Sequence, residues 1–494
     1  MKRPAGKRLC KVVAVNRVNI VDVIRRETGA VHGNVAIVDG AIELSYGRLL
    51  DAVDGVVAAL KQQGVQPLDR VAFLCEDCAD YIIGSLAILQ LGAVVVPVSP
   101  SLMGDELAEL LERMDVTAVL SDASVDQEKG GILLTGCGFM AREFVMHGRV
   151  ARNDFPEDYK SLNPAFIRFS SGTTGSSKGV LLSHETILAR TEAADQGLRI
   201  TSVDTVIWVL SMSFHFVVTI LLYLRRGATV VICRQPFPES FLEAAKGRKG
   251  TVFYAAPFHY HVLATSPLVS ADCLNGVRLA VSTAMKLSRE TAVAFKTKFG
   301  FDLAEAYGII ELGLPFINTE DRPKKPGCVG HLQRGYEVRI ESPGTDGAGV
   351  ILIRGPGLFD AYVSPWKSRR DAVQDGWFNT GDVGRLDADG DLTLLGREKN
   401  VINFVGMKIF PYEVEDVLAS HPAIQECRVY GEAHPLFGQM PCVDVVVKPG
   451  LAAPGATDLR RYCYQRLAAH KVPKEFRFVG HLARTVSGKI KRAG

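Results

Sequence analysis

A short polar stretch of the sequence carries the residue types that hold phosphate groups. Residues 169–180 read F-S-S-G-T-T-G-S-S-K-G-V. Glycines there let backbone N–H groups turn toward a ligand, while hydroxyl groups and one ammonium add donors and positive charge. The donors of this predicted ATP phosphate loop are Ser170, Ser171, Gly172, Thr173, Thr174, Gly175 and Lys178. The lysine precedes a glycine and an apolar run follows, so the loop differs from a Walker A loop.

Apolar residues on both sides of the loop predict two buried strands that position it. Residues 165–167 lead into the loop and residues 180–182 follow it, all of them apolar. A flexible Gly/Ser linker is the alternative interpretation of the loop, and linkers seldom lie between two apolar strands. The pattern therefore favours a ligand-binding turn between paired strands.

Four more polar motifs follow the loop in order. They read A-Y-G-I-I-E at 306–311, W-F-N-T-G-D at 377–382, L-G-R-E-K-N at 395–400 and S-G-K-I-K-R at 487–492. Together with the loop, and with L-S-Y-G-R-L at 44–49 and G-A-V-V-V-P at 92–97, this series resembles the adenylate-forming superfamily. That superfamily comprises acyl-CoA synthetases, nonribosomal-peptide adenylation domains and luciferases.

The resemblance implies a ligase that works in two half-reactions. ATP and a small carboxylic acid first give an acyl-AMP and pyrophosphate, and a thiol then displaces AMP to form a thioester. Coenzyme A and a phosphopantetheinyl carrier protein both stay open as the thiol. The first step joins two anions, so it needs charge neutralisation and positioning more than acid–base catalysis.

The same resemblance assigns roles around the nucleotide. Glu311 is expected to bind Mg²⁺ together with Thr174, and Tyr307 to lie against the adenine ring. Asp382 is expected to accept hydrogen bonds from both ribose hydroxyls, with Arg397 as a second ribose contact. A carboxylate suits a vicinal diol because it offers two acceptor oxygens.

Three further residues are expected to connect the two half-reactions. Lys489, in a Gly-Lys turn near the end of the chain, is expected to stabilise the charge that develops between the carboxylate and the α-phosphate. Lys399 lies where the family keeps its hinge residue, and rotation there would exchange Lys489 for the loop around Gly406, which would line the thiol tunnel. By composition alone, Lys489 also fits a solvated basic tail.

The predicted acid pocket is apolar and partly aromatic. Its residues are Phe214, His215, Phe216, Phe258 and Gly308. His215 follows Phe214 where amino-acid-activating relatives carry an aspartate, and a mostly neutral imidazole is a poor partner for a buried ammonium. An α-amino acid is therefore disfavoured, and an aryl or medium-length acyl acid is expected, with His215 acting as a gate and a catalytic residue.

The pattern of apolar segments predicts an α/β fold. A strand at 71–75, a helix at 79–91 and a strand at 93–98 form a β-α-β unit, which indicates a parallel sheet covered by helices. We expect a large N-terminal domain of two α/β layers plus a small β subdomain, over residues 1–397. A small mobile α+β domain is expected over residues 398–494.

Composition excludes several other classes of protein. Of 494 residues, 47% are hydrophobic and 22% charged, and the net charge is only +3, which gives no field for nucleic acid. The ten cysteines are scattered without zinc-ligand spacing. No signal-peptide pattern and no integral membrane segment are predicted, so a cytoplasmic location is expected.

Two alternatives to a coenzyme A ligase stay open at this point. One is a stand-alone adenylating enzyme that loads a carrier protein. The other is a nucleotide-binding pseudoenzyme, because Ile310 replaces the threonine that the family commonly has and so removes one hydroxyl contact to the α-phosphate. Losing such a donor costs roughly 1–3 kcal/mol.

The role assigned to Lys489 gives a direct test. Lys489→Ala is expected to slow adenylation by at least ~10²-fold, the scale for removing one preorganised charge contact. Thioester formation from preformed acyl-AMP should stay largely intact. Rates of the two half-reactions, measured separately, check this, and equal loss in both would contradict the assignment.

Overall fold

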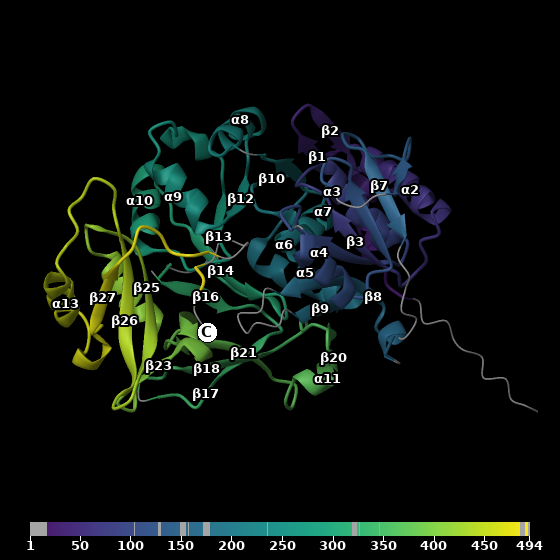
Figure 1. Cartoon of the computed structure of the whole chain (residues 1–494). Coiled ribbons are helices and arrows are strands. Elements are labelled where there is room, and N and C mark those ends of the chain that lie inside the picture. Colours follow the sequence, from purple (N-terminus) through teal and green to yellow (C-terminus); the bar gives the residue numbers. More distant parts are fainter. Residues whose placement is uncertain are drawn as a thin grey trace, which may run out of the picture.

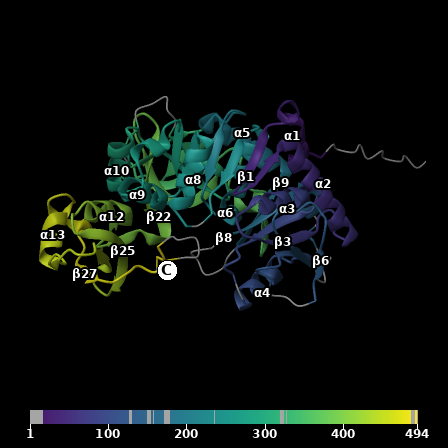
Figure 2. The same ribbon diagram turned by 90° about the horizontal axis from the view of Figure 1, so that it is seen from above.

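The structure is a computed structural model with a large α/β body and a smaller unit at one side (Figures 1 and 2). It describes residues 17–102, 104–126, 130–148, 155–156, 158–170, 178–234, 236–318, 324–325, 327–344, 346–484 and 490–492. Within these ranges, every helix is too short or too polar to cross a membrane.

The larger sheet is mixed and runs through the middle of the body. Its strands, in spatial order, are β17 (Glu337–Glu341), β18 (Gly349–Arg354), β21 (Phe378–Leu386), β22 (Asp391–Arg397), β16 (Cys328–Leu332), β15 (Gly313–Ile317), β14 (Ala304–Ile309), β13 (Leu279–Ser282), β12 (Val252–Ala255), β10 (Thr205–Trp208), β11 (Thr229–Ile232), β1 (Val35–Asp39) and β2 (Ile42–Ser45).

The second sheet carries the arms of the phosphate loop. Its order is β20 (Trp366–Ser368), β19 (Ala361–Val363), β9 (Lys178–Ser183), β8 (Pro164–Ser170), β4 (Val94–Val98), β3 (Arg70–Leu74), β5 (Ala118–Asp122), β7 (Phe144–Gly148) and β6 (Ile132–Leu134). Strands β3 and β4 pair in parallel across α3 (Ala79–Gln90). The predicted β-α-β unit is therefore confirmed.

Helices separate and cover these sheets. The other α-helices of the large body are α1 (Ile20–Glu27), α2 (Tyr46–Gln62), α4 (Gly104–Arg113), α5 (His184–Leu198), α6 (Met212–His215), α7 (Leu221–Arg225), α8 (Glu239–Arg248), α9 (Pro257–Thr265), α10 (Arg289–Phe299) and α11 (Arg369–Ala372). A π-helical turn, Phe216–Ile220, joins α6 to α7. Short 3₁₀ turns lie at Gly29–Val31, Tyr159–Leu162, Ala271–Leu274, Glu398–Asn400 and Ala469–Lys471.

The antiparallel strands after residue 327 are present, as predicted, and they lengthen the larger sheet. Strand β14 pairs in parallel with β13 on one side and antiparallel with β15 on the other. The sheet thus changes from a parallel half, which needs crossover helices, to an antiparallel half joined by short turns. Both halves meet at β14, the strand that contains Tyr307.

The C-terminal unit has its own sheet and core. Its order is β24 (Met407–Ile409), β23 (Ile402–Phe404), β26 (Gly438–Val447) and β25 (Ile424–His434), and β27 (Glu475–Phe478) pairs with β26. Helices α12 (Pro411–Ala419) and α13 (Ala456–Tyr464) cover it. Both views place this unit beside α9 and α10 (Figures 1 and 2). The expected α+β unit is thus observed, and the boundary between residues 397 and 398 stays a prediction.

Surface ion pairs link the two units. Lys286 pairs with Asp416 of α12, and Lys448 lies 2.9 Å from Glu290 of α10. All four side chains are partly exposed to solvent. Exposed ion pairs each stabilise by only about 0–1 kcal/mol, so these two pairs hold the units together only weakly.

Arg190 of α5 ties the turn before β15 to a distant loop. Its side chain is fully buried, and its Nε and Nη1 atoms donate to the carbonyl oxygens of Gly357 and Ile310, each at 2.6 Å. Both carbonyls belong to turn residues, so they are outside the strands in which a neighbouring strand could donate the hydrogen bond instead. Arg190 therefore fixes the position of the segment that presents Glu311.

Replacing this arginine is expected to destabilise the protein. Arg190→Met leaves two buried carbonyl oxygens unpaired, which costs about 2–4 kcal/mol in the free energy of unfolding. Arg48→Met on the exposed face of α2 is the matched control and should change it by less than about 0.5 kcal/mol. Denaturant titration of both variants checks this, and equal effects would contradict the role of Arg190.

Candidate active site

The arms of the phosphate loop form an antiparallel hairpin. Strands β8 and β9 pair from Pro164 with Ser183 to Ser170 with Lys178. The two predicted buried strands are therefore confirmed. Residues 171–177, with Ser171, Gly172, Thr173, Thr174 and Gly175, lie outside the described residues. The hairpin register brings the two ends of the loop together where β8 ends and β9 begins.

Lys178 and Glu311 both contact the side chain of Tyr362. The Lys178 Nζ atom lies 4.9 Å from the ring centroid of Tyr362, a cation–π distance. The Tyr362 hydroxyl donates a hydrogen bond of 3.3 Å to Glu311. Burial raises the pKa of Tyr362, and the Glu311 carboxylate raises it further, so the hydroxyl stays a donor. One tyrosine thus brings a predicted phosphate ligand near the predicted metal ligand.

The turn between β14 and β15 presents Glu311 at the surface of the sheet. Gly308 is exposed, and an added Cβ there would lie 2.3 Å from the Gly313 carbonyl oxygen, so the backbones approach too closely for any other residue. Ile310 packs against the core, and its carbonyl accepts from Arg190. The residue that departs from the family motif therefore supports the turn by packing.

Asp382 is the most tightly held of the predicted nucleotide residues. Its carboxylate accepts from the Tyr307 hydroxyl at 2.6 Å, and it lies 2.8 Å from the Arg397 Nε atom. Its backbone N–H donates to the Thr380 hydroxyl at 3.0 Å. Burial is the largest cause that raises the pKa of Tyr307, and the Asp382 carboxylate raises this pKa further. Burial lowers the pKa of Arg397. The nearby Asp382 carboxylate raises this pKa, and the net pKa of Arg397 is raised.

This arrangement leaves Asp382 able to bind a diol. Each carboxylate oxygen has two lone pairs, so the carboxylate can accept more hydrogen bonds than the two that Tyr307 and Arg397 supply. The register supports the geometry, because Asp382 on β21 lies opposite Arg397 on β22. The three predicted adenine and ribose residues, Tyr307, Asp382 and Arg397, are thus joined through the Asp382 carboxylate.

The predicted acid-pocket residues divide into two sets. Phe214 and His215 end the short helix α6 and are half-buried, and both views place α6 near the centre of the molecule (Figures 1 and 2). Phe216 is almost fully buried and packs on Phe166, with ring centroids 6.4 Å apart. The side chain of Phe258, on α9, is 61% exposed. Phe216 is therefore part of the core, and the pocket roles of Phe216 and Phe258 both stay predictions.

The predicted hinge and tunnel residues lie at the start of the C-terminal unit. Lys399 follows β22 in a 3₁₀ turn, and burial together with the charge of Arg397 lowers its pKa. Gly406 and Val405 form the two-residue turn between β23 and β24, both with positive φ. Such a turn holds a tight hairpin. Lys489 lies outside the described residues.

Glu305 lies under the contact between the two units. It is buried on β14, two residues before Tyr307, and burial raises its pKa to about 8, opposed by Lys286 and reinforced by Asp416. The carboxyl group is therefore mostly protonated at neutral pH. Lys286 can then pair with Asp416 without competition from a second carboxylate.

Several supporting residues could not be found from the sequence. Tyr362 is 51 positions from Glu311, and Arg190 is 120 positions from Ile310. Neither belongs to a motif, so only the folded chain places them together. Thr380 is different, because it belongs to the W-F-N-T-G-D motif and is two residues from Asp382, a spacing typical of side-chain turns.

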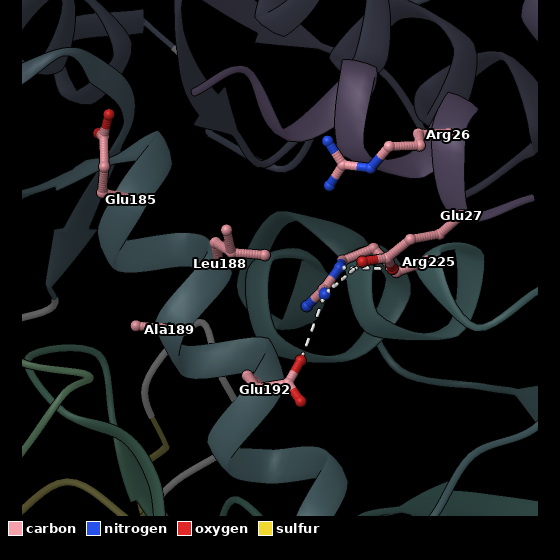
Figure 3. A pocket seen from close by; sticks show the side chains of 7 residues that line it. All are labelled: Arg26, Glu27, Glu185, Leu188, Ala189, Glu192 and Arg225. Carbon is pink, nitrogen blue, oxygen red and sulfur yellow. Dashed lines mark hydrogen bonds and ion pairs between the residues drawn. The ribbon is translucent and has the colours of Figure 1, made fainter. Parts of the chain in front are cut away.

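A surface hollow elsewhere contains none of the predicted site residues. It encloses about 420 Å³ between α1, α5 and α7, and Figure 3 shows the residues that line it. Arg225 lies 2.9 Å from Glu27 and 3.3 Å from Glu192 within it. Arg225 thus links α7 to α1 and α5 through ion pairs.

The Asp382 contacts predict a specific defect in nucleotide binding. Arg397→Met removes one of the two groups that orient the carboxylate, and a hydrogen bond to a charged group contributes about 1.5–3 kcal/mol when buried. Because Arg397 is partly exposed, we expect the KM for ATP to rise roughly 10-fold with little change in kcat. Arg385→Met, on the exposed face of β21, is the matched control and should leave the KM unchanged.

Comparison with known proteins agrees with this geometry. Residues 25–363 match the AMP-binding enzyme family, and residues 413–489 match the AMP-binding enzyme C-terminal domain. A methyl-dioxo-octahydroindenyl propanoyl:CoA ligase of Rhodococcus jostii is 28% identical over 92% of this chain and 94% of its own. A sulfoacetate–CoA ligase of Cupriavidus necator is 31% identical over 67% of this chain and 66% of its own.

Solved structures of similar fold were found with and without nucleotide. ATP-bound MatB from Rhodopseudomonas palustris superposes with a TM-score of 0.83 at 26% identity, covering 95% of this chain and 97% of its own. The apo form of MatB gives 0.76 at 25% identity, covering 96% and 97%. The predicted superfamily and two-domain fold are confirmed, and the chain belongs to the AMP-binding enzyme family.

Proposed function

We propose that this protein is an ATP-dependent carboxylic acid:coenzyme A ligase that forms an acyl-AMP and then a thioester. The enzyme class predicted from the sequence, an AMP-forming acid–thiol ligase, is confirmed by the family match and by relatives named as CoA ligases. The structural observation that carries the proposal is the Asp382 carboxylate, which Tyr307 and Arg397 hold ready for a ribose diol.

The nucleotide would lie along the antiparallel half of the larger sheet. The Tyr307 ring would support the adenine, and Asp382 with Arg397 would bind the ribose. The loop that ends at Lys178 would then hold the phosphates that leave as pyrophosphate, because Lys178 and Glu311 share the Tyr362 ring. This order runs from the base to the terminal phosphate across one face of the site.

Glu311 fits the requirements of a magnesium ligand. Its carboxylate is half-buried and offers hard oxygen atoms, and Mg²⁺ is commonly held by one or two carboxylates together with substrate phosphates. A bound Mg²⁺ would neutralise charge on the phosphates. Glu311 would hold it with Thr174, while Tyr362 keeps the carboxylate oriented.

The chain's own residues would drive the first half-reaction by positioning. The acid's carboxylate oxygen attacks the α-phosphorus, the bond to the β-phosphate oxygen breaks, and pyrophosphate leaves. Lys489 would stabilise the charge on the reacting oxygens, and His215 would close the acid pocket. Attack is brought about by holding two anions together in a site that compensates their charge.

Rotation of the C-terminal unit about Lys399 would then change which of its residues face the active site. The turn that contains Gly406 would replace Lys489, and a thiol would attack the acyl carbon with release of AMP. Weak ion pairs between the two units support this alternation, since Lys286–Asp416 and Lys448–Glu290 are both partly exposed.

We propose an aryl or medium-length acyl acid as substrate, in the cytoplasm. Phe214 and the other apolar residues around α6 favour a partly aromatic acid, and His215 disfavours an α-amino acid. All nine cysteines that the structure describes are free thiols, which suits a reducing compartment. Coenzyme A is the acceptor that the names of the relatives support.

The proposal is tested by acid-dependent exchange of ATP with labelled pyrophosphate over a panel of aryl and acyl acids. We expect exchange with at least one class of acid, followed by thioester formation when coenzyme A is added. A phosphopantetheinylated carrier protein is the comparison acceptor. Preference for the carrier would identify a stand-alone adenylating enzyme.

Absence of exchange with every acid would favour the pseudoenzyme interpretation. Ile310→Thr then separates the two explanations, because restoring the common hydroxyl would restore exchange only if that contact limits the reaction. Glu311→Gln is the negative control, since it keeps the shape of the side chain and removes its charge. It should abolish exchange.

A further inference from the structure

Arg168 on β8 is a cation that the fold does not use. The residue is half-buried, and its Nε atom is buried without a hydrogen-bond partner. Across the described ranges of the chain, its guanidinium forms no hydrogen bond and no ion pair. Its recorded contact is a cation–π contact, with the guanidinium carbon 5.3 Å from the ring centroid of Phe214.

Two hydroxyl groups beside Arg168 are also unpaired. The side-chain oxygens of Tyr81, on α3, and Ser213, on α6, are buried and make no hydrogen bond to a described residue. Ser213 is near enough to lower the pKa of Tyr81, although the two hydroxyls do not reach hydrogen-bond geometry. Buried polar groups in proteins are normally paired, so three orphaned groups from three elements indicate a missing partner.

A comparison with Arg190 shows that Arg168 is not a structural residue. Burial lowers the pKa of both arginines to about 10. Arg190 offsets its burial with two carbonyl oxygens at 2.6 Å and leaves only Nη2 unpaired. No described residue accepts a hydrogen bond from Arg168, and a desolvated charge without such acceptors destabilises a fold. Its presence is therefore better explained by a ligand than by stability.

The position of Arg168 identifies the ligand's place in the site. Phe214, which its guanidinium covers, immediately precedes the predicted gate His215. Tyr81 packs against Phe216, with ring centroids 5.7 Å apart, so all three orphaned groups border α6 and the π-helical turn. Glu311 interacts electrostatically with Arg168 from the nucleotide side. Arg168 thus lies between the predicted acid gate and the predicted metal ligand.

We infer that Arg168, Tyr81 and Ser213 bind a second anionic group of the substrate acid, so that the enzyme activates an acid with an additional carboxylate or sulfonate. A guanidinium pairs with either group through two parallel N–H donors, and the two hydroxyls supply further donors. This inference rests on the proposed function and narrows its acid from a purely apolar one to one with a charged end.

The test measures exchange of ATP with pyrophosphate for matched pairs of acids, such as hexanoate with adipate and phenylacetate with 4-carboxyphenylacetate. In the pair of acids that the native enzyme uses better, its kcat/KM for the diacid should be at least ~10-fold higher than for the monoacid. Arg168→Met should lower this value by at least ~30-fold, the scale for truncating one partner of a buried charge pair. The monoacid value and the KM for ATP should change by less than about 3-fold.

Two further variants separate binding from structure. Arg168→Lys keeps the charge without the two-pronged geometry and should restore part of the diacid activity, and Tyr81→Phe should lower only the diacid value. Arg168→Met should leave the Tm unchanged or raise it, whereas Arg190→Met should lower it by several degrees. A large fall in Tm for Arg168→Met would show a structural arginine and overturn the inference.

Other results of these measurements would give Arg168 a different role or refute the proposal. A raised KM for ATP with equal loss for both acids of a pair would place Arg168 on the nucleotide phosphates and overturn the inference. Preference of the native enzyme for monoacids would overturn it as well, while leaving the proposed ligase intact. Absence of exchange with every acid would instead refute the proposed function.

Discussion

The carboxylate of Asp382 is the point on which the nucleotide half of the site depends. It brings together three strands of the larger sheet, because Tyr307 comes from β14, Arg397 from the end of β22 and Asp382 itself from β21. A carboxylate with two fixed donors keeps one orientation before a ligand arrives. The rigid sheet therefore supplies preorganisation that a loop could not provide.

The acid half is built less rigidly, and three of its buried polar atoms, in Arg168, Tyr81 and Ser213, have no hydrogen-bond partner among the described residues. α6 is short, ends in a π-helical turn and holds Phe214 and His215 only half-buried. The Nε atom of Arg168 and the hydroxyl of Tyr81 lie beside it, and no described residue forms a hydrogen bond with either. Such groups reduce stability and are retained where a ligand completes them, which is the usual relation between function and stability at binding sites.

The contact between the two units follows the same physical logic. A domain that must change position is held best by interactions that are specific but weak. Ion pairs such as Lys448 with Glu290 meet this requirement, since solvent screens them. The protonated state of Glu305 keeps Lys286 available for its partner in α12.

The sequence by itself determined the family, the α/β fold and most residues of the nucleotide site, because each motif is a short run whose spacing is set by local backbone geometry. Tyr307, Asp382 and Arg397 could be named in this way before their contact was known. Only the tertiary structure decided which distant residues meet. Arg190 and Arg168 are the same residue type and belong to no motif that gives them different roles, so the sequence pattern does not distinguish them. Packing places two carbonyl oxygens at hydrogen-bond distance from Arg190, whereas no described residue accepts a hydrogen bond from Arg168. The carbonyls that Arg190 meets lie more than a hundred positions away in the chain.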